Sequence, residues 1–195
     1  MNAASPLYGG SLFSGPRVRL TAVRPEDVAT VTRWYEDSDF TRQYDASASY
    51  PRSANRFQKI LTEVNESDTA FMFAIRLHHT DDLIGVIDLD YVLWSSGVTW
   101  LAIGIGEAAY RGQGYGGEAL ELALRFAFHE INMHRVQLTV FSTNERAIRL
   151  YERLGFTREG VLREFLHRDG QRFDTYVYGL LAREWEARQA GGGEG

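Results

Sequence analysis

Four closely spaced glycines constrain the fold of this chain more than any other feature. They lie in the stretch 109–119 and are Gly112, Gly114, Gly116 and Gly117. An apolar run typical of a strand, residues 98–105, precedes the stretch, and a run with helical periodicity, residues 118–131, follows it. Glycine lets the backbone approach a ligand closely, and the first turn of a helix presents free N–H groups and a partial positive charge. The pattern therefore indicates an anion-binding loop, and the phosphate of a cofactor is the simplest ligand.

Composition narrows the class of protein. A chain of 195 residues corresponds to one domain. It has no apolar run of membrane-spanning length and no signal-peptide pattern at its start. Cysteine is absent, which excludes disulfides, thiolate–zinc sites and a cysteine nucleophile and suits a cytoplasmic protein. The net charge of -5, without a dense basic block, argues against nucleic acid as the main ligand.

The order of elements predicts an α/β fold. We expect a flexible segment at 1–16, one domain at 17–182 and a polar, disordered tail at 183–195. Strands are expected at 17–23, 70–77, 83–92, 98–106, 135–141, 156–165 and 173–181, and helices at 24–37, 52–65, 118–131 and 144–154. Residues 38–51 are expected to form a loop. Short links predict an antiparallel meander over 70–106, whereas the helix before 135–141 predicts a parallel pairing with 98–106.

The glycine loop alone has three interpretations. Gly112-x-Gly114-x-x-Gly117 matches the dinucleotide-binding pattern, but that pattern belongs directly after the first strand of a βαβ unit, with an acidic residue ending the next strand. Residues 140–144 contain no acidic residue, and three or more strands precede the loop. A nucleotide P-loop needs Gly-Lys, which does not occur in the chain. The third interpretation is purely structural: the glycine-rich turn only caps a helix and binds no cofactor.

Two linked motifs resemble the GNAT acyltransferase superfamily. Arg111-x-x-Gly114-x-Gly116 is similar to the family's pyrophosphate-binding signature, and the run from Asn144 to Phe156 is similar to its second hallmark, N-x-x-A-x-x-x-Y-x-x-x-G-F. The resemblance covers about residues 17–182. Glu159–Glu164 and Phe128-His129 look closest to the bacterial branch that acetylates ribosomal-protein N-termini and polyamines. The resemblance to the superfamily implies an α/β fold with a mostly antiparallel mixed sheet. In this sheet a central parallel pair of strands is splayed at a bulge, and helices flank the sheet.

The resemblance also implies a cofactor and its contacts. The cofactor is acetyl-CoA, used as a co-substrate without a metal. Its pyrophosphate is expected on the backbone of Gly112, Gln113, Gly114, Tyr115, Gly116 and Gly117, with Arg111 beside it. Its pantetheine arm is expected along Ile103, Gly104 and Ile105. Gly104 is also the position where a bulge would splay the strands.

The second motif supplies the expected acid. Asn144 is either a helix N-cap or a partner of the pantetheine amides. Ala147 and Tyr151 are four residues apart and share one helix face. By resemblance this face looks toward the cofactor thiol, so that Tyr151 gives a proton to the departing thiolate. Its alternative is a half-buried tyrosine with a packing role.

The general base and the acceptor amine each have more than one candidate. Asp88 and Asp90 are two apart on one strand face, together with Ile84 and Val86, and Glu107 follows the central strand. Any of the three carboxylates is a candidate base, directly or through water, or a solvated surface group. The acceptor is a primary amine of a small molecule or a protein N-terminus.

Other features carry less information. The aromatic residues Tyr44, Tyr50, Trp94 and Trp100 line a substrate cleft or pack in the core. His78-His79 falls in a turn, which argues against a metal site. A homodimer is expected from the family, and a non-catalytic acyl-CoA-binding module of the same fold is the alternative function.

Overall fold

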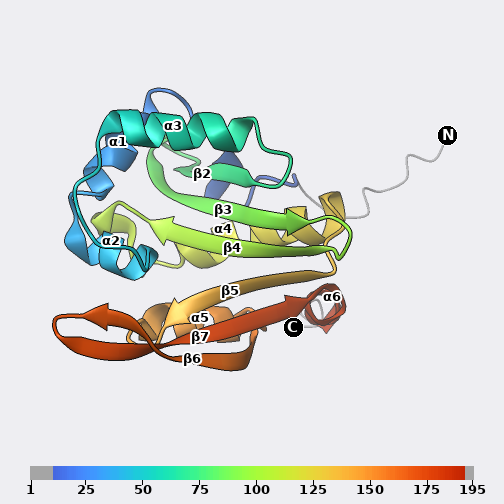
Figure 1. Ribbon diagram of the computed structural model, residues 1–195. Helices are drawn as coiled ribbons and strands as arrows, with labels where there is room; N and C mark the ends of the chain where they lie inside the picture. The colour runs from blue at the N-terminus through green and yellow to red at the C-terminus, as the bar shows by residue number, and fades with distance from the viewer. Residues whose placement is uncertain (1–10, 192–195) are drawn as a thin grey trace.

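A single seven-stranded sheet organises the molecule (Figure 1). The computed structural model describes residues 11–191, and its strand order is β1-β2-β3-β4-β5-β7-β6. The strands are β1 (Val18–Thr21), β2 (Phe71–Leu77), β3 (Leu83–Leu93), β4 (Val98–Ile105), β5 (Arg135–Phe141), β6 (Thr157–Arg168) and β7 (Gln171–Leu181). The helices are α1 (Asp27–Trp34), α2 (Ser38–Tyr44), α3 (Ala54–Asn65), α4 (Tyr115–Arg125), α5 (Glu145–Arg153) and α6 (Ala182–Gly191), with a 3₁₀ turn at Ala108–Tyr110 and a π turn at Phe126–Glu130.

The predicted strand pairings are confirmed. β2, β3 and β4 form an antiparallel meander, and β4 pairs with β5 in parallel. The parallel pairing joins only Val98–Trp100 to Arg135–Gln137, so the two strands separate beyond it. The bulge expected at Gly104 is not there: the β3–β4 register is regular through this residue and shifts instead between Asp90 and Leu93. The splay therefore needs no bulge at the glycine.

Helices cover both faces of the sheet (Figure 1). Side chains alternate along β3, so that Val86 packs with α1, α2 and α3, whereas Ile87 packs with α4 on the opposite face. Asp88 and Asp90 lie on the Val86 side, as expected. Ile84 was expected on the same face as Val86, but it lies on the opposite face, in the cluster that packs with α4.

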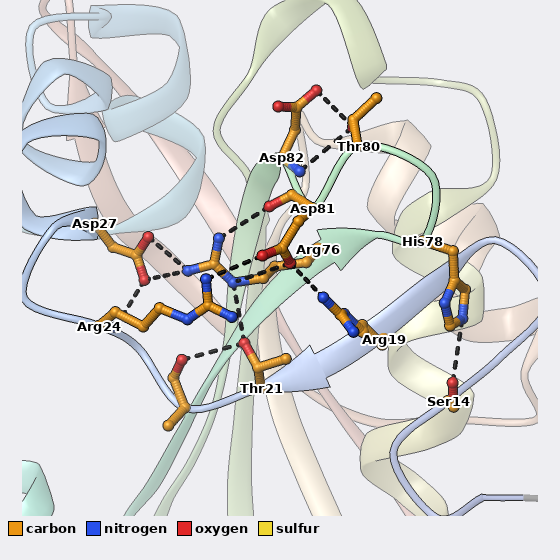
Figure 2. A network of polar contacts seen from close by, with 11 residues as sticks. Ser14, Arg19, Thr21, Arg24, Asp27, Arg76, His78, Thr80, Asp81 and Asp82 are labelled. Carbon is orange, nitrogen blue, oxygen red and sulfur yellow. Dashed lines mark hydrogen bonds and ion pairs between the residues drawn. The ribbon is translucent and has the colours of Figure 1, made fainter.

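A buried ion pair fixes α1 against the sheet (Figure 2). Arg76 Nη2 lies 2.5 Å from Asp27 Oδ2, and both side chains are almost fully buried. Arg76 also donates to the carbonyl of Asp81, and Asp27 accepts from the backbone N–H of Arg24 at the start of the helix. Burying two charges is favourable only when they are paired and hydrogen-bonded, which this network achieves.

The segment 38–51, expected as a loop, begins with a helix. Asp37 caps α2 by accepting hydrogen bonds from the backbone N–H groups of Asp39 and Phe40. The helix places Phe40 and Tyr44 over β4, where a Cβ added at Gly104 would lie 2.8 Å from each ring. Only glycine leaves room for this close approach.

The two ends of the domain are more ordered than expected. Ser14 bridges to Arg19, and Leu12 and Phe13 pack on the core. The tail from residue 182 forms α6, whose Trp185 is buried and donates from Nε1 to Glu121 Oε2 at 3.1 Å. The remaining tail residues, 192–195, and residues 1–10 lie outside the described part of the chain.

The glycine-following helix starts earlier than expected. It begins at Tyr115, so Gly116 and Gly117 belong to its first turn and Gly114 is the N-cap. Within residues 11–191, none of the helices is long and apolar enough to cross a membrane.

Candidate active site

The gap between β4 and β5 is the centre of the candidate site. From residue 101 onward the side of β4 that faces β5 has no strand partner. Ile103 and Ile105 point toward α4, where their side chains lie within 4.0 Å of a Cβ added at Gly116. Gly104 points the other way, under Phe40 and Tyr44. An extended chain can therefore reach the backbone of residues 103–105 between the two strands.

The glycine loop sits at the end of this gap. Gly112 and Gly114 have φ values of 80° and 87°, which side chains other than glycine adopt at a cost. Gly114 caps α4 without a side chain, and its carbonyl accepts from the N–H groups of Gly117 and Glu118, which leaves those of Tyr115 and Gly116 without a bond to the cap residue. These N–H groups and the helix dipole suit an anion. The backbone geometry thus fits the expected position of a pyrophosphate.

Arg111 is engaged by the protein itself. Its Nε donates to the carbonyl of Ile105 at 2.9 Å, and its Nη2 donates to the carbonyl of Gly106 and to Asp37 Oδ2. The pKa of Asp37 is lowered, because hydrogen bonds from Arg111 and backbone N–H groups outweigh its partial desolvation. Arg111 therefore ties the glycine loop to the end of β4 and to the start of α2.

Two other arginines lie at the loop, and the sequence motifs did not single them out. Arg17 donates to the carbonyl of Gln113 at 3.0 Å and pairs with Glu118 at 2.9 Å. Arg146 Nη1 lies 3.9 Å from a Cβ added at Gly112, and no carboxylate of residues 11–191 forms an ion pair with it. The position of Arg146 three residues into the second motif was the available signal.

The second motif forms a capped helix, α5, which packs against the glycine loop through Arg146 and Leu150. Asn144 Oδ1 accepts from the N–H of Ala147 at 3.1 Å, so the N-cap role is confirmed. Tyr151 is buried against Phe156 and Tyr178, and its hydroxyl group has no hydrogen-bond partner among the described residues. Burial raises the pKa of Tyr151 to about 12, which keeps the hydroxyl group protonated.

The candidate bases have different surroundings. Asp88 is buried, and its Oδ2 accepts from the hydroxyl group of Tyr44 at 2.6 Å, whereas Oδ1 has no partner. Burial, with a smaller contribution from Asp90, raises the pKa of Asp88 to about 7 although the Tyr44 hydrogen bond lowers it. Glu107 lies at the end of β4, 29% exposed, and accepts from Trp34 Nε1 at 3.0 Å and from Arg33.

A cavity of about 180 Å³ lies beside Asp88, between β2–β3 and the helices α1, α2 and α3. Of the aromatic residues expected at a cleft, Tyr44 lines this cavity. Tyr50 is 42% exposed, Trp94 is 50% exposed and donates to the carbonyl of Asp68, and neither lines it.

The turn that contains His78 and His79 is held by hydrogen bonds to other parts of the chain. His78 hydrogen-bonds through Nε2 to Ser14 (Figure 2). The same nitrogen also hydrogen-bonds to the carbonyl of Gly15. Among the residues that the structure describes, no group of three or more His, Asp or Glu side chains is arranged to hold a metal ion.

Comparisons with known proteins agree with this geometry. A family model described as an acetyltransferase (GNAT) domain matches residues 17–157. YokL, an uncharacterized prophage-derived N-acetyltransferase of Bacillus subtilis, is 32% identical over 89% of this chain and 95% of its own length. The ribosomal protein uS5-alanine N-acetyltransferase of Escherichia coli is 28% identical over 87% of this chain and 94% of its own.

Solved structures share the fold. A spermidine N-acetyltransferase from Vibrio cholerae, in complex with CoA and spermine, superposes with a TM-score of 0.81 at 20% identity and covers 88% of this chain and 99% of that one. A dodecameric structure of the spermidine N-acetyltransferase from the same organism superposes with a TM-score of 0.76 at 21% identity, over 89% of this chain and 99% of that one.

Proposed function

This chain belongs to the GNAT acetyltransferase family, and from that premise we propose that it transfers an acetyl group from acetyl-CoA directly to a primary amine. One observation carries the proposal: the unpaired edge of β4 leads into the glycine loop, and α5, the helix that contains Tyr151, packs against that loop through Leu150. A thioester laid along β4 would meet both an anion-binding helix start and a proton donor.

The protein supplies three kinds of contact for the cofactor. Backbone N–H groups of residues 113–116 bind the pyrophosphate, and Arg146 adds a positive charge at the same loop. The backbone of residues 103–105 binds the pantetheine arm in the manner of an added strand, because β5 leaves that edge free. Arg111 holds the loop in place, and Asn144 keeps α5 capped beside it.

Tyr151 acts as the general acid. The amine nitrogen attacks the thioester carbonyl, the tetrahedral intermediate collapses with cleavage of the C–S bond, and the sulfur takes the Tyr151 proton. A pKa of about 12 keeps that proton in place at neutral pH. Burial also raises the proton affinity of the leaving thiolate, which brings the pKa of the thiol closer to that of the Tyr151 hydroxyl group. An N–H group near Ile105 polarises the carbonyl.

The amine proton leaves toward Glu107 rather than Asp88. Glu107 follows the end of β4 and is held by Trp34 and Arg33, and because its side chain is partly exposed, a water molecule has access to it. Asp88 lies behind Tyr44, whose ring covers Gly104. We propose that Glu107 accepts the proton through water and that Asp88 has the separate role described below.

Thiol release tests the proposal. Purified protein, acetyl-CoA and a panel of primary amines should release free thiol in step with formation of the N-acetyl product. A non-catalytic acyl-CoA-binding module, the alternative, would bind CoA without turnover by any amine in the panel. The panel should contain short diamines, polyamines and peptides with free N-termini, since the acceptors named for the relatives fall in both classes. Self-association of the chain is a related proposal, supported by the dodecameric neighbour.

A further inference from the structure

The cavity beside Asp88 contains negative charge that the protein does not neutralise. Asp88 and Asp90 both line it, and among residues 11–191 neither carboxylate forms an ion pair. Two arginines lie over rings of the cavity wall, and each pairs with another carboxylate: Arg52 lies over Tyr35 and pairs with Asp45 at 2.8 Å, and Arg111 lies over Phe40 and pairs with Asp37 at 2.9 Å. The carboxylates of Asp88 and Asp90 are therefore available to bind a cation in the cavity.

The clearest sign of a missing ligand is a single atom. Oδ1 of Asp88 is buried and has no hydrogen-bond partner, and the residue as a whole is only 6% exposed. A buried acceptor without a partner is costly, and such an atom in a native structure calls for a ligand, an ion or a water molecule. Asp88 lines the cavity, which supplies the space for this partner.

The rest of the wall selects the kind of cation. It is formed by aromatic rings, among them Trp34, Tyr35, Phe40 and Tyr44, and by aliphatic side chains of α3. Aromatic faces attract organic cations, and apolar walls favour a cation that carries an alkyl chain over a hydrated metal ion. The volume of about 180 Å³ slightly exceeds the roughly 150 Å³ of an engineered cavity that accommodates benzene. A group of about five to seven non-hydrogen atoms therefore fits.

We propose that this cavity binds the non-reacting alkylammonium group of a diamine acceptor, with Oδ1 of Asp88 accepting its hydrogen bond and Asp90 adding charge. An ammonium group paired with carboxylates has no free electron pair, so it cannot be the nucleophile. The rings of Phe40 and Tyr44 also separate the cavity from Gly104. The bound group thus anchors the acceptor while its other amine reacts at the gap. This inference names the acceptor of the proposed transfer and so rests on that function.

Binding without turnover tests the cavity by itself. Calorimetric titration of the protein, without acetyl-CoA at about pH 8, with n-butylammonium should give saturable binding, whereas 1-butanol of the same shape should bind at least about tenfold more weakly. Asp88→Asn should weaken n-butylammonium binding by about tenfold to a hundredfold, the effect of losing a hydrogen bond to a charged group. Val64→Phe, which fills the cavity from α3, should also abolish binding. Asp39→Asn, an exposed aspartate on α2 outside the cavity, is the matched control and should bind like the wild type.

Steady-state kinetics connect the cavity to the reaction. The test diamine must be longer than the cavity, so that its second amine extends past Phe40 and Tyr44. With acetyl-CoA, the wild type should have a KM for 1,8-diaminooctane at least about tenfold below that for n-octylamine. Asp88→Asn should raise the diamine KM by a similar factor and retain kcat. A collapse of kcat for both amines would instead make Asp88 the base and overturn the proposal.

The two proposals fail in different ways. Turnover without n-butylammonium binding, or with equal binding of 1-butanol, would overturn the cation cavity and leave the acetyltransferase intact. Binding of n-butylammonium without turnover of any amine would refute the acetyltransferase, and with it the assignment of the cavity to an acceptor.

Discussion

The buried carboxylate of Asp88 should make the stability of the protein fall as the pH rises. Its pKa is about 7 in the folded protein, against an ordinary value of 3.8 for a solvated aspartate in the unfolded chain. The folded state therefore holds the proton more tightly than the unfolded chain, so stability is highest below the lower value and declines until the pH passes the higher one. The difference of about three pH units corresponds to roughly 4 kcal/mol.

Replacement by the neutral isostere should remove this dependence. Asp88→Asn keeps the shape and still accepts the hydrogen bond of Tyr44, but it has no charge to bury. Between about pH 5 and 8, the wild type should lose roughly 2–3 kcal/mol of unfolding free energy relative to the variant. Near pH 8 the variant should therefore be the more stable protein, even though it is the weaker binder of a cation.

Urea unfolding followed by tryptophan fluorescence, at several pH values, measures both curves. Other groups titrate in this range, so the informative quantity is the difference between the two proteins at each pH. Asp39→Asn should follow the wild type, since Asp39 is exposed. Parallel curves for the wild type and Asp88→Asn would refute the reasoning, because they would mean that Asp88 is charged at little cost in the folded protein.

Three further changes test other parts of the structure. Tyr151→Phe should lower kcat by roughly 10 to 10⁴-fold in the thiol-release assay and leave acetyl-CoA affinity in calorimetry nearly unchanged; an unaltered rate would exclude the acid role. Asp27→Ala should cost about 3–5 kcal/mol in urea unfolding, because Arg76 would stay buried without its partner; a cost below about 1 kcal/mol would show that water reaches this pair. Trp185→Ala should cost about 3–5 kcal/mol, and a neutral result would mean that α6 does not dock on the domain.

Local patterns predicted most of the fold because they report the elements that form the sheet. The helical run between residues 106 and 135 predicted the parallel pairing of β4 and β5, since a crossover of that kind returns a strand to the same direction. The spacing of Asp88 and Asp90 correctly placed both on one face. Gly155 ends α5 with a φ of 92°, as expected for a C-terminal cap.

The failures concern short or polar elements that depend on tertiary contacts. α2 has seven residues, and its signal was only the capping pattern that begins at Asp37. The tail has a polar composition, so a single buried side chain, Trp185, decides that α6 docks. A single-sequence pattern contains no information of this kind.

The motifs of the candidate site could be predicted from the sequence, but the hydrogen-bond partners of its side chains could not. The spacing of the glycines indicated the loop, and the resemblance of the second motif indicated Asn144 and Tyr151, but the contacts of Arg111 with Asp37 and of Asp88 with Tyr44 join residues that are far apart in the sequence. The separation of β4 and β5 also occurs without the bulge that was expected at Gly104. The cavity that Asp88 and Asp90 line is likewise formed by residues from separate elements of the chain.

A crystal structure of the protein with bound CoA tests the central claim most directly. The account predicts the pyrophosphate on the N–H groups of residues 113–116, the pantetheine arm along residues 103–105, and the thiol within hydrogen-bond reach of the Tyr151 hydroxyl group. CoA bound away from the gap between β4 and β5, or a thiol remote from Tyr151, would contradict it.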